Sequence, residues 1–80
     1  MFHKILSVKP MDNYLLLVQF ANGEQKKYDV SALFSKWDVF RTLETVSGLF
    51  NQVKVDSGGY GISWNDEIDL SCEELYANGI

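Results

Sequence analysis

The sequence predicts an α+β fold, an antiparallel sheet of about five short strands with a short C-terminal helix packed on it. The strands are expected as a hairpin, a short helical segment and a second hairpin. The clearest evidence is residues 53–64, where apolar and polar residues alternate on both sides of an Asp-Ser-Gly-Gly turn. Earlier in the chain, Asn22-Gly23 gives another hairpin signal between two strand patterns. The C-terminal residues carry helix start and stop signals instead.

Length and composition indicate a single domain over residues 1–80, because 80 residues leave no room for a second core. Eleven aromatic residues supply a core without disulfides. Cys72 is the only cysteine, which fits a reducing cytoplasm. The N-terminus lacks the pattern of a cleaved signal, and the longest apolar run, residues 14–18, is too short to span a bilayer. We therefore expect a cytoplasmic protein without a membrane partner.

Charge is divided unevenly, with a net of +2 in residues 1–54 and −6 in residues 55–80. Binding to a phosphate backbone needs clustered Lys and Arg, so direct nucleic-acid binding is not expected. Two interpretations of the acidic end remain. It is either a solvated segment that keeps the protein soluble, or a surface that meets a basic partner.

The first two strands are expected at residues 4–9 and 14–20, separated by a Pro-Met-Asp-Asn turn. The second of these strands carries apolar residues on both faces, which predicts a central position in the sheet. On one face lie Leu6 and Val8 of the first strand with Tyr14, Leu16, Val18 and Phe20 of the second; on the other lie Ile5, Ser7, Leu15 and Leu17. The apolar residues of the second face need cover, so a homo-oligomer is one alternative.

Two registers are compatible with the Asn22-Gly23 turn. A two-residue turn places Leu17 opposite Tyr28, whereas a three-residue loop over residues 21–23 places Leu16 opposite Tyr28. Burial favours the second, because it gathers the apolar side chains on one face.

Between the hairpins, residues 31–46 are expected to form one or two short helical turns, with Ser31 as the N-cap. The last helix begins after Ser71, which has the spacing of a capping box with Glu74. Gly79 stands where a C-cap glycine belongs. These signals predict a short helix docked by Leu75 and Tyr76.

Residue types that carry catalysis or bind metals are present only as isolated groups. His3 and Cys72 have no partners of the same kind, and Asp56, Asp66 and Asp69 are attributed to capping and solvation. No cofactor, metal or catalytic residue is therefore expected.

The glycines of the hairpin over residues 53–64 allow two interpretations. Gly58, Gly59 and Gly61 lie between strands, unlike the glycines of a phosphate loop. They are explained by turn geometry and close packing. The alternative is a small-molecule site on the bared strand near Gly59 and Gly61.

Three aromatic residues remain as candidates for partner binding: Trp37, Tyr60 and Trp64. Most aromatics of so small a domain must be core, but an exposed one would be a plausible anchor for a partner. Trp37 is preferred because its segment is the least regular. With the acidic Glu73 and Glu74, these three residues form the predicted partner-binding set.

The chain also resembles a family of small bacterial domains of unknown function, marked by a hairpin of the form V-x-V-D-x-G-G-Y-G-I-x-W. The residues that carry the resemblance are 6–10, 20–24, 28–30, 50–56, 59–64, 69–70 and 75–76. The sequence departs from the family at residues 65–68, where Asn-Asp-Glu-Ile replaces a glycine-containing turn.

The resemblance implies a modest range of functions. Such domains occur alone or ahead of a helix-turn-helix, and some are encoded beside a small candidate toxin. This implies an antitoxin or adaptor role, and the family has no established catalytic residues. The sequence thus predicts a non-catalytic protein-interaction module whose partner is another protein, with a basic, neighbour-encoded one as the first candidate.

Overall fold

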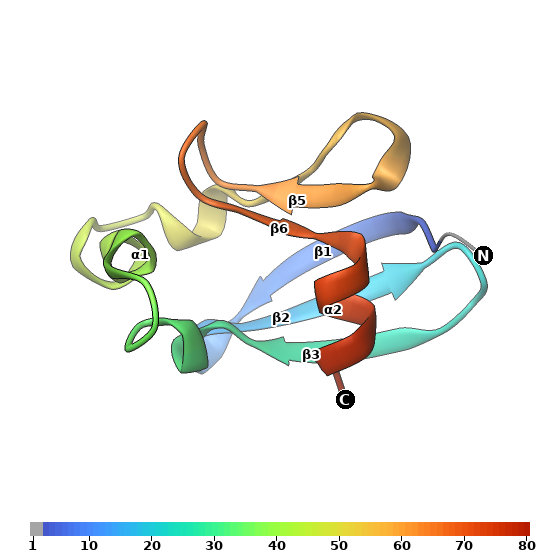
Figure 1. Cartoon of the computed structure of the whole chain (residues 1–80), viewed down its shortest axis with the longest axis horizontal. Coiled ribbons are helices and arrows are strands. Elements are labelled where there is room, and N and C mark those ends of the chain that lie inside the picture. The colour runs from blue at the N-terminus through green and yellow to red at the C-terminus, as the bar shows by residue number, and fades with distance from the viewer. Residues whose placement is uncertain (1–2) are drawn as a thin grey trace.

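The computed structural model describes residues 3–80, whose strands form two three-stranded antiparallel sheets (Figure 1). The strand orders are β1-β2-β3 and β4-β5-β6. The strands are β1 (Ile5–Met11), β2 (Leu15–Phe20), β3 (Gln25–Asp29), β4 (Lys54–Val55), β5 (Gly61–Ser63) and β6 (Asp69–Ser71). The helices are α1 (Thr42–Thr45) and α2 (Cys72–Asn78), and short 3-10 turns are η1 (Asp12–Tyr14), η2 (Val30–Leu33), η3 (Asp38–Arg41), η4 (Phe50–Gln52) and η5 (Ser57–Gly59). Residues 1 and 2 lie outside the described residues, and with them the start of the segment in which no cleaved signal is expected.

The predicted α+β class is confirmed, with six strands divided between two sheets. Helix α2 packs against β3, β5 and β6, and β4 lies beside β1. In Figure 1, α2 lies across the first sheet, and β5 and β6 run along its upper side. The core forms between these layers because each sheet has one apolar face to bury.

Strand β1 differs from its prediction in length and in facing. It continues through Pro10, which pairs with Leu16, and an edge strand tolerates this proline. A bulge between Ile5 and Ser7 shifts the alternation by one residue. Ile5 is therefore buried in the core, and Leu6 is 61% exposed. The prediction that Leu6 lies on the apolar face and Ile5 on the other was wrong.

The turn from β1 to β2 holds two consecutive residues with left-handed backbone, Asn13 at φ 63° and Tyr14 at φ 61°. Tyr14 was expected to begin the second strand, but β2 begins at the next residue. This conformation is rare for a bulky side chain. The Tyr14 ring meets the rings of Phe34 and Phe50 edge-on, with centroids 5.2 Å apart in both pairs, which offsets the backbone cost.

The register of the β2–β3 hairpin follows the three-residue loop. Leu16 pairs with Tyr28, and Gly23 takes a left-handed φ of 93° at the end of the loop. The apolar face predicted from this register is buried at Leu16, Val18, Phe20, Tyr28 and Val30. On the opposite face Leu15 and Leu17 are half-buried.

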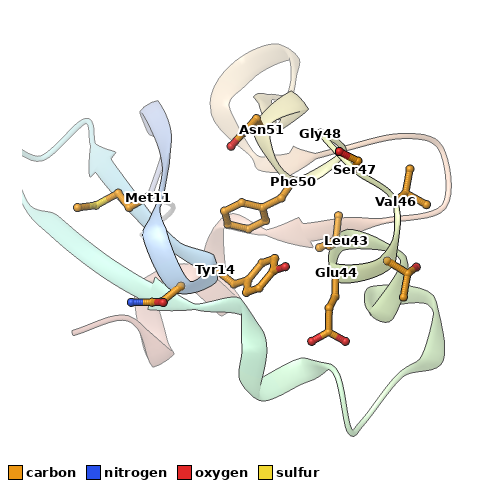
Figure 2. Close-up of a pocket in the computed structure, with 11 residues that line it drawn as sticks. Met11, Tyr14, Leu43, Glu44, Val46, Ser47, Gly48, Phe50 and Asn51 are labelled. Carbon is orange, nitrogen blue, oxygen red and sulfur yellow. The ribbon is translucent and has the colours of Figure 1, made fainter.

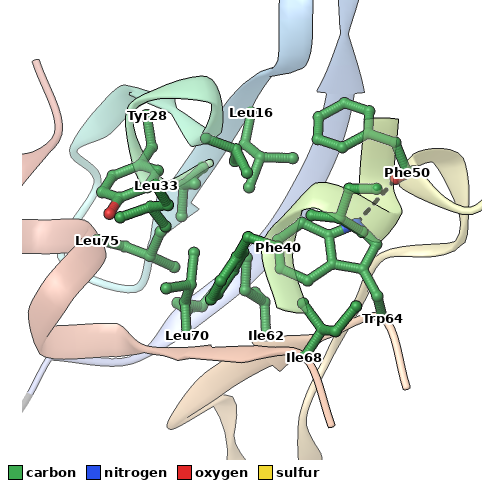
Figure 3. Packing of buried hydrophobic residues seen from close by; sticks show 14 of the residues in the cluster. Leu16, Tyr28, Leu33, Phe40, Phe50, Ile62, Trp64, Ile68, Leu70 and Leu75 are labelled. Atoms are coloured by element: carbon green, nitrogen blue, oxygen red, sulfur yellow. Dashed lines mark hydrogen bonds between the residues drawn. The ribbon is translucent and has the colours of Figure 1, made fainter. Parts of the chain in front are cut away.

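The core joins both sheets and α2 (Figure 3). Trp64 is one of its members and is 5% exposed. Its indole N–H donates a hydrogen bond of 3.0 Å to the Phe50 carbonyl, which satisfies the one polar group of the side chain. The fully enclosed large side chains are Phe20, Leu16, Ile62, Ile68, Leu75, Val18 and Val30.

The second predicted hairpin is present, with Val55 paired to Ile62. Tyr60 was expected to share a strand face with Ile62, but it lies in the turn, with φ −87° and ψ −6°. The loop over residues 65–68 is closed by the side chain of Asn65. Its side-chain oxygen accepts hydrogen bonds of 2.9 Å from the backbone N–H groups of residues 67 and 68.

The middle segment forms short helical turns, as predicted, but with a different N-cap. The Asp29 carboxylate accepts hydrogen bonds from the Ser31 backbone N–H (3.0 Å) and hydroxyl (2.6 Å). The cap of η2 is therefore Asp29 rather than Ser31. This is an Asx turn, in which the aspartate side chain accepts a hydrogen bond from the backbone N–H group two residues later.

Helix α2 ends at the predicted C-cap, Gly79, but with a different backbone conformation from the usual capping glycine. Gly79 has φ −75°, so it is not a left-handed C-cap. A Cβ at this position would lie 2.6 Å from the Leu75 carbonyl oxygen and 3.0 Å from Lys26 Cβ, so glycine is required by close approach. Ile80 then pairs with Lys27 through two backbone hydrogen bonds of 2.7 and 2.9 Å, which places the last residue along the edge of β3.

The start of α2 gives a first testable prediction. Ser71 Oγ accepts a hydrogen bond of 3.1 Å from the backbone N–H of Glu74, as an N-cap does. Ser71→Ala should lower the free energy of unfolding by about 1 kcal/mol, because one N–H of the first turn loses its acceptor. Urea denaturation followed by circular dichroism measures this change. Ser35→Ala, at an exposed turn position, is the control, and equal losses in both variants would contradict the capping role.

Candidate partner-binding surface

The five residues predicted to bind a partner are divided among separate places. Trp37 follows η2 and is 54% exposed, Tyr60 is 59% exposed in the β4–β5 turn, and Trp64 is in the core. The segment between η2 and η3 and the turn between β4 and β5 lie at opposite ends of Figure 1. Trp64 therefore cannot contribute to an exposed surface, which corrects its place in the predicted set. Its indole is buried because β5 carries it between the rings of Phe40 and Phe50.

Tyr60 is exposed for a local reason. Its ring lies beside Gly58, where an added Cβ would come within 2.7 Å of Tyr60 Cε2. The Lys4 ammonium lies 5.5 Å from the centroid of the Tyr60 ring, which is a weak cation–π geometry. Tyr60 thus covers its own turn and stands apart from Trp37.

Two hollows of the surface lie beside each other, and Trp37 and Glu74 line both of them. The first has a volume of about 400 Å³, and its other lining residues are Val39, Phe40, Asp69, Leu70 and Ser71. The second has a volume of about 330 Å³, and its other lining residues are Tyr28, Asp29, Ala32, Leu33, Lys36 and Asn78. We call these residues together the Trp37 surface. It brings together two members of the predicted set, Trp37 and Glu74.

Glu74 is held in place by two neutral donors. The Tyr28 hydroxyl donates to its Oε2 at 2.7 Å, and the Asn78 amide donates to the same oxygen at 3.0 Å. The capping-box prediction had this carboxylate reach back to the helix start, but it turns toward β3 instead. Sequence reasoning missed both donors. The i, i+4 spacing of Asn78 was a usable signal, whereas no local pattern relates Glu74 to Tyr28.

The Tyr28–Glu74 contact predicts a pH effect. Burial, the hydrogen bond to Glu74 and the nearby negative charges raise the pKa of Tyr28 above its ordinary value near 10. The unfolded chain therefore loses this proton first as the pH rises above about 10, so the stabilisation is complete below that pH and is lost above it. Urea denaturation at pH 8 and at pH 10.5 should show a smaller alkaline loss for Tyr28→Phe than for the unaltered protein. An equal loss would contradict this linkage.

Glu73 lies on the exposed side of α2 next to Cys72. Cys72 is 3% exposed, and its thiol donates to the His3 carbonyl oxygen at 3.2 Å. Burial, with a smaller effect of the Glu73 charge, raises the pKa of the Cys72 thiol. Both effects oppose the thiolate, so the side chain acts as a small core residue.

The glycines of the second hairpin are covered by the chain itself. A Cβ on Gly59 would lie 2.8 Å from the Ile5 carbonyl oxygen, and one on Gly61 would lie 2.7 Å from the Leu70 carbonyl oxygen. Both glycines are buried. The space beside these two glycines is filled by backbone, which leaves no room there for the small molecule of the alternative interpretation.

A third hollow, of about 520 Å³, lies between the β1–β2 turn and the segment from α1 to η4 (Figure 2). Figure 2 shows the rings of Tyr14 and Phe50 pointing into it, and Glu44 is the one charged residue of its lining. The sequence carried no signal for this hollow, because its two sides come together only in the fold. Within residues 3–80 there is no group of three His, Cys, Asp or Glu side chains able to hold a metal ion.

None of the helices in the described part of the chain has the length and apolar content needed to cross a bilayer. The fold itself has a known counterpart in the crystal structure of NE0471, a proposed DNA-binding protein from Nitrosomonas europaea ATCC 19718. The two chains superpose with a TM-score of 0.79 at 22% sequence identity, over 96% of this chain and 48% of that one. This chain therefore spans about half the length of NE0471, and the likeness shows a shared fold.

A comparison with curated proteins finds no match. A family model described as protein of unknown function (DUF2442) matches residues 5–80, nearly the whole of the described chain. The chain belongs to the DUF2442 family.

Proposed function

We propose that this domain is a non-catalytic protein-interaction module that binds a partner polypeptide through the Trp37 surface. The observation that carries the proposal is the exposed indole of Trp37 between two hollows. Tryptophan is the residue most enriched among interface hot spots, and hot-spot side chains pack into concave, desolvated sites. The first hollow adds the apolar side chains of Val39 and Leu70 beside the indole, so a partner that covers this place would bury apolar area together with Trp37.

Charge supports a basic partner. Residues 55–80 carry a net charge of −6, and Asp29, Asp69 and Glu74 line the two hollows against the single cation Lys36. A complementary basic surface would be steered toward this side and oriented on it. The antitoxin or adaptor role implied by the family resemblance needs such a partner, and a neighbour-encoded basic protein in the cytoplasm would meet the requirement.

Direct DNA binding is the competing function, suggested by the description of NE0471. That description belongs to a chain about twice as long, of which this domain matches 48%. A net charge of −4 disfavours contact with phosphates. We therefore assign this domain the protein-binding role and not the nucleic-acid contact.

The test is to tag the protein at its native expression level, purify it gently from its host and determine the masses of its complexes. A stoichiometric second protein that is retained by the unaltered domain and by Tyr60→Ala, but lost with Trp37→Ala, is the expected result. Tyr60→Ala is a matched control, because it also removes an exposed aromatic ring at a distant turn. Retention of the partner by Trp37→Ala, or recovery only as a monomer or homodimer, would overturn the proposal.

A further inference from the structure

We propose that the Trp37 surface recognises an arginine side chain of the partner, whose guanidinium stacks on the Trp37 indole and pairs with the Glu74 carboxylate, two groups that belong to residues lining both hollows. This inference rests on the proposed function and names the chemistry of the contact. It follows from the arrangement of three side chains, namely Glu74, Trp37 and Phe40.

Glu74 is prepared for a cation. Both hydrogen bonds that it receives, from Tyr28 and Asn78, fall on Oε2, and both donors are neutral. Neither donor brings a positive charge to this side chain, and among the described residues Oε1 receives no hydrogen bond. The side chain is half-buried, and its two hydrogen bonds restrict its rotamers in the free domain. A preorganised carboxylate binds a cation more tightly than a mobile one, because less entropy is lost on binding.

The indole is likewise supported from one side. The Phe40 ring lies 6.0 Å from the Trp37 ring, centroid to centroid, at an interplanar angle of 41°. Phe40 is 5% exposed and belongs to the core, so the indole packs against a core residue on one side. Trp37 remains 54% exposed, which leaves area on the indole for a ligand.

The lining of the first hollow favours a cation with an apolar stem. Asp69 and Glu74 are its two charged residues, both acidic, and Val39, Phe40 and Leu70 supply apolar contacts. The second hollow is less suited, because Lys36 lines it and would repel a positive charge. The occupant that fits is therefore a basic side chain that enters the first hollow beside Trp37.

Arginine fits this site better than lysine. Its planar guanidinium stacks on an aromatic face while its N–H groups remain in plane to donate to a carboxylate, and it is more weakly hydrated than an ammonium. A lysine can reach only one of these contacts at a time with its compact charge.

The experiment is a titration of the protein with N-acetyl-arginine N-methylamide, followed by ¹H–¹⁵N spectra of the two indole N–H groups. The buried Trp64 indole, bonded to the Phe50 carbonyl, is the internal reference for an intact fold. We expect a saturable shift of the Trp37 signal in the millimolar range and a constant Trp64 signal. The corresponding lysine and citrulline derivatives should bind at least about tenfold more weakly.

Two matched variants locate the contact. Glu74→Gln keeps an acceptor for Tyr28 but removes the charge, and it should weaken arginine binding about tenfold. Glu73→Gln removes an equal charge from the exposed side of the same helix and should leave binding within about twofold, because an exposed charge is screened. An unshifted Trp64 signal in both variants shows that any loss is local.

Three results would overturn the inference: no saturable shift of Trp37, equal binding of lysine and arginine, or equal effects of Glu73→Gln and Glu74→Gln. Capture of the partner from its host separates this failure from failure of the proposed function. If Trp37→Ala abolishes capture while the arginine derivative does not bind, the interaction role stands and the arginine contact falls. If capture survives Trp37→Ala, both fall.

Discussion

Trp64→Ala is expected to lower the free energy of unfolding by about 3–5 kcal/mol, the usual cost of removing a large buried aromatic side chain. Trp64 is 5% exposed and lies between the rings of Phe40 and Phe50. The substitution opens a cavity and also leaves the Phe50 carbonyl without its indole donor. A domain of 80 residues has a total stability of roughly 4–12 kcal/mol, so this loss is a large fraction of the total and would unfold a domain at the low end of that range. Urea denaturation and near-UV circular dichroism measure the loss.

The other tryptophan is the matched control. Trp37→Ala removes the same side chain from a site that is 54% exposed, and it should change the stability by no more than about 0.5 kcal/mol. Similar losses for the two variants would show that Trp37 is part of the core and would remove the basis of the partner-binding surface. The pair of variants thus tests the fold and the candidate site together.

Gly59→Ala is expected to destabilise the protein by about 2–5 kcal/mol, from two causes. The backbone of Gly59 has φ 79°, which an L side chain rarely adopts. The added Cβ would also lie 2.8 Å from the Ile5 carbonyl oxygen and 3.1 Å from the Ile5 nitrogen. Both atoms are backbone atoms of β1, so the clash can be relieved only by moving the β4–β5 turn away from the first sheet.

Gly23→Ala separates these two causes. Gly23 has φ 93° but no atom within 4 Å of an added Cβ, so its substitution carries the conformational cost alone, about 1–2 kcal/mol. Thermal or urea unfolding of both variants gives the difference that belongs to the close contact with β1. A Gly59→Ala variant no less stable than Gly23→Ala would mean that the turn does not pack on Ile5 as the structure has it.

The two tryptophans show where prediction from the sequence stopped. Both were candidates for partner binding, and both have polar neighbours in the chain, Lys36 and Asp38 for Trp37 and Ser63 and Asn65 for Trp64. Their exposure differs because β5 carries Trp64 into the space between the sheets, whereas Trp37 sits in a turn between two short helical segments. Alternation along a strand cannot distinguish them, since the covering residues come from other elements.

The same limit applies to the candidate site. The negative charge of Glu74 was predicted from its place in an acidic segment, but its hydrogen bond to Tyr28 joins residues 46 positions apart. The bulge at Ile5 was likewise unmarked by any glycine or proline in the sequence. The position of this bulge depends on how β1 packs against the rest of the fold, so the neighbouring residues carry no sequence signal for it.

By itself, the sequence determined the α+β class, both hairpins, the three-residue loop at Asn22-Gly23, the start of α2 at Ser71 and the acidic character of residues 55–80. These features depend on turn chemistry, side-chain periodicity and neighbouring residues, which act over a few positions. The tertiary structure alone decided that the strands divide into two sheets, that Trp64 is buried and Trp37 exposed, and that Glu74 meets Tyr28. Those outcomes depend on which apolar faces cover one another, a choice made by contacts between segments far apart in the chain.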